Sequence, residues 1–181
     1  MTHHEKILVF STSNSKNSIN QKFAKYVANL IPNIKTTLLD INDFEMPIYS
    51  IDRENTYGIH PLAHDFKKNV KGHDALIISL AEHNGAYTAA FKNIFDWISR
   101  INDGSIWYDK PILLLSTSPG PRGAKTVLNT AKVTFGLMSK GEVTPFSLPE
   151  FNKNFDTNTG ITDTLLKNEL DKCITNFTNS I

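Results

Sequence analysis

A chain of 181 residues has the length of one domain and is long enough to bury a substantial core. Its composition, 40% hydrophobic and 20% charged, is that of an ordinary globular protein. The 19 Lys and Arg nearly balance the 18 Asp and Glu, and no apolar run approaches the length of a membrane span. We therefore expect neither nucleic acid nor a membrane among the partners of this chain.

The single cysteine, Cys173, excludes an internal disulfide and a cysteine-based metal centre. Three histidines, His60, His64 and His73, show no metal-ligand spacing with carboxylates, so no metal is expected. Residues 1–5 lead directly into a predicted strand, which is not the pattern of a signal peptide. These features indicate a reducing compartment, and we expect the cytoplasm.

Short apolar runs alternate with amphipathic helical patterns along the whole chain. The runs predict strands at residues 7–10, 34–41, 75–81, 111–116 and 143–148. The helical patterns predict helices at residues 20–31, 61–71, 86–101 and 124–138, and a last one from about residue 162. Residues 42–60 and 152–159 are expected to be irregular loops.

Five strands alternating with five helices predict one α/β domain over residues 1–181, with an open parallel sheet covered by helices on both faces. The right-handed crossover rule leaves few topologies, and the order 2-1-3-4-5 is the common one at this length. In such sheets ligands bind at the carboxyl ends of the strands, where the strand order reverses. Here that point lies between the first and third strands.

The segment after the first strand, residues 11–20, contains five hydroxyl side chains, three Asn and no Gly. It lies between a strand and a helix. Two interpretations are open for this segment alone. It is either a solvated turn with an ordinary helix cap, or a neutral site for a phosphate at the positive end of a helix.

Two further polar segments are expected at the same edge of the sheet, residues 82–87 after the third strand and residues 116–123 after the fourth. The chain has neither a P-loop nor the G-x-G-x-x-G of dinucleotide sites. A hydroxyl-rich loop suits a single terminal phosphate. Asn84-Gly85 adopts positive φ easily, either as a plain turn or as a turn that presents backbone N–H groups to a heterocycle. FMN combines a terminal phosphate with such a ring.

At this point the sequence resembles the NADPH-dependent FMN reductases, which have a flavodoxin-like, three-layer fold and include quinone, chromate and azo-dye reductases. The family pattern G-S-x-R-x-x-S-x-N is matched over residues 12–20, with Thr12 in place of the Gly and Ser15 in place of the Arg. A second pattern, P-E-Y-N-x-S-x-P-x-x-L-K-N-A-I-D-W, is matched over residues 81–97 by Glu82, Asn84, Lys92, Asn93, Asp96 and Trp97. A third, Lys-Pro followed by a Ser- and Gly-containing loop, is matched over residues 110–124.

The resemblance implies a role for residues in each loop. Those expected to hold the phosphate are Ser13, Ser15, Ser18, Ile19 and Asn20. Those expected to line the ring, mostly through backbone groups, are Glu82, His83, Asn84 and Gly85. Those expected to close the ribityl and dimethylbenzene side are Ser116, Thr117, Ser118 and Gly120. Pro47 and Tyr49 would border the acceptor pocket, and Arg122 is either a nicotinamide-phosphate contact or a solvated loop residue.

The resemblance also implies that hydride passes from NADPH or NADH through FMN to a quinone, an azo compound, free flavin or a similar small oxidant. No catalytic side chain is expected, because the chemistry belongs to the cofactor. A homodimer or homotetramer is implied. Two other functions stay open, a flavodoxin-type electron carrier and a flavin-free binding domain. The net charge of +1 disfavours the carrier, because carriers are usually strongly acidic.

Overall fold

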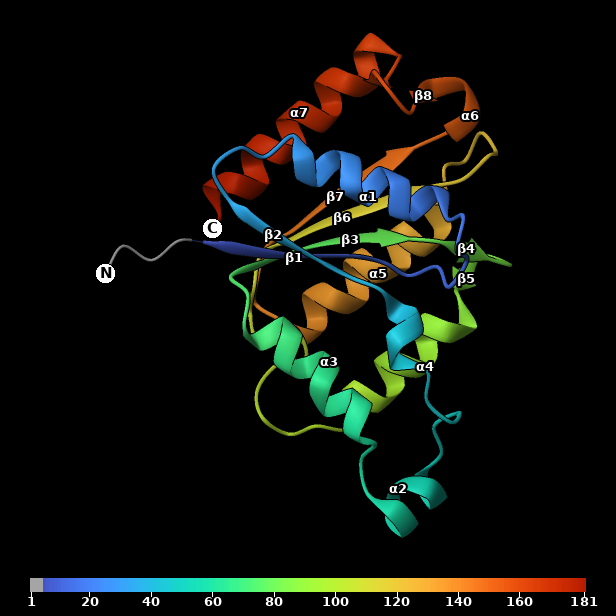
Figure 1. Cartoon of the computed structure of the whole chain (residues 1–181), viewed down its shortest axis with the longest axis vertical. Coiled ribbons are helices and arrows are strands. Elements are labelled where there is room, and N and C mark those ends of the chain that lie inside the picture. The colour runs from blue at the N-terminus through green and yellow to red at the C-terminus, as the bar shows by residue number, and fades with distance from the viewer. Residues whose placement is uncertain (1–4) are drawn as a thin grey trace.

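In the computed structural model, which describes residues 5–181, one five-stranded parallel sheet forms the middle layer (Figure 1). Its order is β2-β1-β3-β6-β7, which confirms the predicted 2-1-3-4-5 arrangement of the main strands. The strands are β1 (Lys6–Ser11), β2 (Lys35–Leu39), β3 (Ala75–Leu80), β6 (Ile112–Thr117) and β7 (Val143–Leu148). Residues 1–4 lie outside the described residues. The expectation that the chain has no signal peptide rests partly on them.

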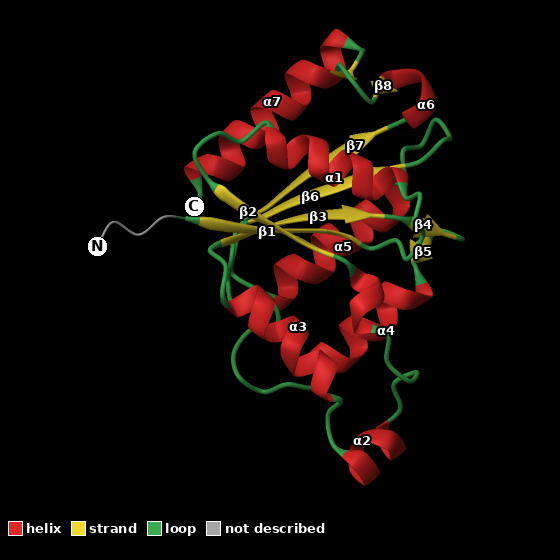
Figure 2. Cartoon of the chain, in the orientation of Figure 1, coloured by secondary structure: helices red, strands yellow, loops and turns green. Residues whose placement is uncertain are grey.

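Helices cover both faces of the sheet (Figure 2). On one face lie α1 (Ile19–Asn29) and α7 (Thr164–Asn179), and on the other lie α3 (Pro61–Lys71), α4 (Ala89–Ile98) and α5 (Lys125–Met138). Among residues 5–181, no helix is both long enough and apolar enough to cross a bilayer.

Each of the central strands β1, β3 and β6 supplies side chains to two separate cores, because successive residues of a strand point to opposite faces. Leu8 and Phe10 of β1 pack with the core under α3, α4 and α5. Ile7 and Val9 pack with the core under α1 and α7. This explains why the central strands are apolar throughout, as expected of a parallel sheet that is buried on both faces.

Residues 42–60 are not the irregular loop that the sequence predicts. They hold most of a 3-10 turn, η1 (Ile41–Phe44), and a short helix, α2 (Ile51–Tyr57). Asp40 begins η1, because its carboxylate accepts a hydrogen bond from the Asn42 N–H at 2.9 Å. Ser50 begins α2 in the same way, accepting from the Arg53 N–H at 3.2 Å. Such local caps are short-range signals that hydrophobic periodicity does not detect.

The helix predicted over residues 86–101 begins three residues later, at Ala89. Residues 86–87 instead form β5 (Ala86–Tyr87), which pairs with β4 (Glu82–His83) in a hairpin. Asn84 and Gly85 make its two-residue turn with φ of 53° and 75°, which confirms the predicted positive φ. Residues 152–159, also expected to be a loop, belong largely to α6 (Phe151–Asn154) and to β8 (Phe155–Asp156), which pairs with β9 (Gly160–Ile161).

Candidate functional site

The loop after β1, residues 12–18 and here called the first loop, is held by its own hydroxyl groups and by that of Ser11 at the end of β1. The Ser13 N–H donates to Ser11 Oγ at 3.1 Å, and the Ser15 N–H donates to Ser13 Oγ at 3.2 Å. The Asn17 N–H continues the series to Ser15 Oγ at 3.3 Å. Each serine therefore fixes the backbone two residues further on, and the loop turns into α1 without a glycine.

The first loop ends at a helix terminus that suits an anion. Ser18 is the N-cap of α1, and its Oγ accepts from the Gln21 N–H at 3.1 Å. The N–H groups of Ile19 and Asn20 lie in the first turn, where no intrahelical carbonyl can accept from them. That turn, which the structure describes in full, holds no acidic residue. The partial positive charge of the helix end is thus left for a ligand.

Three loops meet around one cavity of about 320 Å³, here called the loop cavity. They are the first loop, the second loop (residues 81–88) and the third loop (residues 116–123). Nine of the thirteen predicted site residues line this cavity: Ser13, Ser15, Ser18, Ile19, Asn20, Glu82, His83, Thr117 and Ser118. Asn17, Ala81 and Pro119 line it as well and were missed, although each lies next to a predicted residue in the chain.

The other four predicted residues do not line the loop cavity. Ser116 is fully buried in β6, and its hydroxyl donates to the Gly123 carbonyl at 2.7 Å. The Gly120 carbonyl accepts from the Glu150 N–H at 3.0 Å, so it anchors the third loop to the end of β7. Asn84 and Gly85 form the exposed tip of the hairpin.

The Glu82 side chain acts within the protein. Its Oε2 accepts from the Val127 N–H in the first turn of α5 at 2.9 Å. Ala124, the N-cap residue of α5, makes no side-chain cap bond within the described chain. Glu82 therefore caps a helix that begins 43 residues later, and this contact joins the second loop to the start of α5, which follows the third loop. Glu82 is the one carboxylate among the described lining residues, and one of its oxygens is bonded to the start of α5.

The Asn20 side chain is likewise internal. It is 4% exposed, and its Oδ1 accepts from Ser79 Oγ at 2.9 Å and from the Thr117 N–H at 3.1 Å. Its Nδ2 donates to the Thr117 carbonyl at 3.2 Å. Asn20 pairs with the end of β6 much as a strand would, so only its backbone N–H remains for a ligand.

Asn93 and Trp97, on α4, hold the loop that follows β2. Trp97 Nε1 donates to the Pro47 carbonyl at 2.8 Å, and Asn93 Nδ2 donates to the Met46 carbonyl at 2.9 Å. Asn93 Oδ1 accepts from the Tyr49 N–H at 2.8 Å. These contacts fix the segment that follows β2 against α4.

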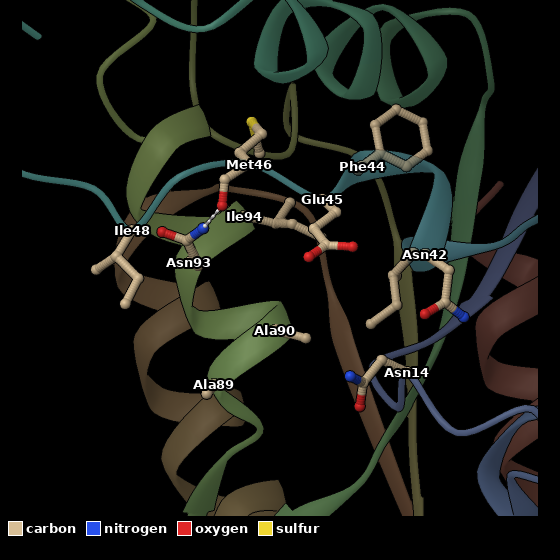
Figure 3. A pocket seen from close by; sticks show the side chains of 11 residues that line it. Asn14, Asn42, Phe44, Glu45, Met46, Ile48, Ala89, Ala90, Asn93 and Ile94 are labelled. Atoms are coloured by element: carbon tan, nitrogen blue, oxygen red, sulfur yellow. Dashed lines mark hydrogen bonds between the residues drawn. The ribbon is translucent and has the colours of Figure 1, made fainter. Parts of the chain in front are cut away.

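A second cavity, of about 290 Å³, lies beneath this braced loop (Figure 3). Asn14 of the first loop, the segment after β2 and the start of α4 surround it. Serine side chains at positions 13 and 15 line the loop cavity, whereas Asn14 between them lines this one. Alternate residues of the first loop therefore line two different cavities, and the loop separates them.

The residues around the loop cavity fit a phosphate monoester attached to a polar ring. Hydroxyls and free helix N–H groups supply neutral donors at one end, and the backbone of the second and third loops lies at the other. Within the described part of the chain, no group of three His, Cys, Asp or Glu side chains could hold a metal ion.

Comparison with known proteins identifies the family. Residues 5–153 match the family described as NADPH-dependent FMN reductase. The chain belongs to this family. FMN and NAD(P)H are accordingly its cofactors, and the chain is a flavin-dependent oxidoreductase.

The relatives span a range of descriptions. An uncharacterized MG342 homolog of Mycoplasma pneumoniae is 32% identical over 87% of this chain and 95% of its own length. A 2-hydroxy-1,4-benzoquinone reductase of Burkholderia sp is also 32% identical, over 65% of this chain and 63% of its own length. FerB, a flavoenzyme NAD(P)H:(acceptor) oxidoreductase from Paracoccus denitrificans, superposes with a TM-score of 0.74 at 22% identity, covering 97% of this chain and 98% of FerB. At that identity the superposition shows the flavodoxin-like fold alone.

Proposed function

We propose that this chain transfers reducing equivalents from NADPH or NADH, through FMN bound in the loop cavity, to a quinone or a similar small planar oxidant. The observation that carries the proposal is the neutral donor set at the start of α1, which internal hydrogen bonds join to the third loop through Asn20 and to the second loop through Thr12. Residues 1–181 act here as one FMN-binding domain.

The phosphate of FMN binds to the hydroxyls of Ser13, Ser15 and Ser18 and to the N–H groups of Ile19 and Asn20 in this proposal. The backbone of Glu82, His83, Thr117 and Ser118 contacts the ring and ribityl portions in the cavity, and Asn84, Gly85 and Gly120 contact the parts of the cofactor that extend beyond it. When bound, FMN supplies the two-electron chemistry between nicotinamide and oxidant. The chain itself positions the cofactor and needs no side-chain nucleophile.

Arg122 is the basic residue that we assign to the nicotinamide phosphate. It is exposed beside Gly123, in the loop that hydrogen bonds fix to the end of β7. A charge on a fixed loop attracts a diffusing anion at low ionic strength. Pro47 and Tyr49, held by α4, border the acceptor pocket.

A quinone is the acceptor class that the relatives favour, because several are described as quinone reductases. The test is to purify the chain with FMN and to follow flavin absorbance and NAD(P)H oxidation with and without a benzoquinone, an azo dye and free FMN. Rapid oxidation that needs the quinone supports the proposal. A colourless protein that FMN does not restore would contradict it, and a yellow protein that neither nicotinamide reduces would indicate an electron carrier.

We also propose a homodimer or homotetramer in the cytoplasm. Large apolar side chains are exposed on α2 and α5 and beside α2, with Tyr57 84%, Leu137 83% and Ile48 77% accessible, and an assembly would cover such side chains. Light scattering of the purified protein tests the assembly. A mass equal to one chain at all concentrations would refute it.

A further inference from the structure

Thr12 is a buried residue at the position where the family pattern has glycine. It directly follows β1, and its N–H donates to the Ser79 carbonyl at 2.9 Å, which extends the pairing of β1 with β3 by one residue. The whole residue is 0% exposed. It therefore cannot contact a ligand in the loop cavity, and any role must act through its neighbours.

The Thr12 hydroxyl bonds to the start of the second loop. Its Oγ1 accepts from the Ala81 N–H at 2.9 Å, in a buried contact between residues 69 positions apart. Ala81 lines the loop cavity and immediately precedes Glu82. A glycine has no side-chain acceptor, so this bond exists only because residue 12 carries a hydroxyl.

The Thr12 backbone bonds to the other end of the second loop. Its carbonyl accepts from Thr88 Oγ1 at 2.5 Å, and the same hydroxyl accepts from the Phe91 N–H at 3.2 Å as the N-cap of α4. Residue 12 thus holds both ends of the segment that carries the β4–β5 hairpin. The first and second loops cannot separate without breaking two buried hydrogen bonds.

We propose that Thr12 is a positioning residue that sets the spacing between the first loop, which binds the FMN phosphate, and the second loop, which contacts the ring. This inference rests on the proposed function. A ligand that spans both loops gains affinity when their spacing is already correct, because less conformational freedom is lost on binding. Such preorganisation compensates for Ser15, which supplies no positive charge to the phosphate.

The test compares FMN with riboflavin, which has the same ring and ribityl chain but no phosphate. Thr12→Val keeps the shape of the side chain and removes the acceptor, whereas Thr12→Ser keeps the hydroxyl. We expect Thr12→Val to weaken FMN binding on the order of tenfold, because a buried N–H loses its partner. Riboflavin binding should change less than about twofold, since each loop stays intact by itself. Thr12→Ser should match the unaltered chain within about twofold for both ligands.

Two controls separate positioning from general stability. Thr12→Gly restores the family residue and gives a second variant without the hydroxyl, should Thr12→Val fold poorly. Thr144→Val makes the same exchange at a buried position near the start of β7, away from the three loops, and should leave both affinities unchanged. Equal losses for FMN and riboflavin, or unchanged FMN affinity in both variants that lack the hydroxyl, overturn the inference.

The proposed function is judged separately. If the unaltered chain binds no FMN, the proposed function fails. Amide hydrogen exchange of the ligand-free protein then tests whether Thr12 couples the first loop to the second. Faster exchange at Ala81 in Thr12→Val supports the coupling, and unchanged exchange overturns it.

Discussion

At the scale of single residues, the first loop relies on neutral groups where the family pattern has a charged one. Ser15 lines the loop cavity and is exposed, and its hydroxyl already accepts from the Asn17 N–H. A hydrogen bond from a charged group to a phosphate is roughly twice as strong as a neutral one. A substitution of Ser15 by a charged residue should therefore change the affinity for FMN.

Ser15→Arg should tighten FMN binding about fivefold at low salt, corresponding to about 1 kcal/mol for a partly exposed charge-assisted contact. The gain should shrink as salt rises, because the new contact is screened. Titration of FMN fluorescence at low and high ionic strength measures both effects. Ser15→Gln, similar in length but neutral, is the control, and an equal, salt-independent gain in both variants would argue against a charge effect.

Asn20 is the residue whose loss should damage the site most. Asn20→Leu has a similar volume but leaves the Thr117 N–H and the Ser79 hydroxyl without their partner inside the protein. We expect a loss of about 3 kcal/mol in the free energy of unfolding, measured by urea denaturation. Asn17→Ala, at an exposed position of the first loop just before α1, should change stability by less than about 0.5 kcal/mol. Similar values for the two variants would show that the Asn20 contacts matter little.

At the scale of elements, α2 is the least integrated helix. None of its residues, all of which the structure describes, is buried. It lies below α3 and α4 in Figure 1, away from the sheet. Glu54 joins it to the body: its Oε2 accepts from Arg100 Nε at 2.8 Å and from the Tyr49 hydroxyl at 2.9 Å. A short helix without a buried face depends on such contacts.

Acid should release α2. The hydrogen bond from Arg100, and then that from Tyr49, hold the pKa of the Glu54 carboxyl below its ordinary value of 4.5. A lowered pKa in the folded state means that the contribution is present above pH 4.5 and is lost as the pH falls through the folded value. Amide exchange of residues 48–58 should therefore rise as the pH falls from 5 to about 3, after correction for the intrinsic rate.

Glu54→Gln should show this faster exchange already at neutral pH and little further change on acidification. Glu169→Gln, on the exposed side of α7, removes a carboxylate far from α2 and should behave like the unaltered chain. A Glu54→Gln profile identical to that of the unaltered chain would mean that other contacts hold α2.

At the scale of the whole molecule, two cores fix the sheet and leave its carboxyl edge to polar loops. The cores between the strands and their covering helices are apolar, whereas the contacts that join the three loops to one another and to α5 are hydrogen bonds. Such contacts require correct geometry, which the rigid sheet provides. The site therefore forms only when the whole sheet is folded. Ligand binding at this edge should accordingly raise the free energy of unfolding of the whole chain.

FMN at 100 times its dissociation constant should stabilise the chain by about 2.7 kcal/mol. For a protein of this size that corresponds to a rise of roughly 5–10 °C in the melting temperature. Differential scanning fluorimetry with a range of FMN concentrations measures it, with AMP as a phosphate-bearing control ligand. A shift of equal size with AMP would indicate anion binding without recognition of the flavin.

Much of this architecture is predictable from the sequence. Alternating apolar runs and amphipathic patterns predict the parallel sheet and its order, and Asn84-Gly85 predicts its turn. The errors fall where local caps override periodicity, as at Ser50 and at Thr88, which begins α4 later than expected. The extent of the domain, the assembly and the ligand contacts of individual residues stay predictions.

The sequence by itself determined the order of the elements, the topology and the family, because periodicity and short motifs depend only on residues that are close together in the chain. Only the tertiary structure decided what several motif residues do. Asn20 bonds to Thr117, Glu82 to Val127 and Thr12 to Ala81 across 97, 45 and 69 positions. The physical reason is that a hydrogen bond depends on the distance and direction between two groups, and these are set only when the sheet brings distant loops to one edge.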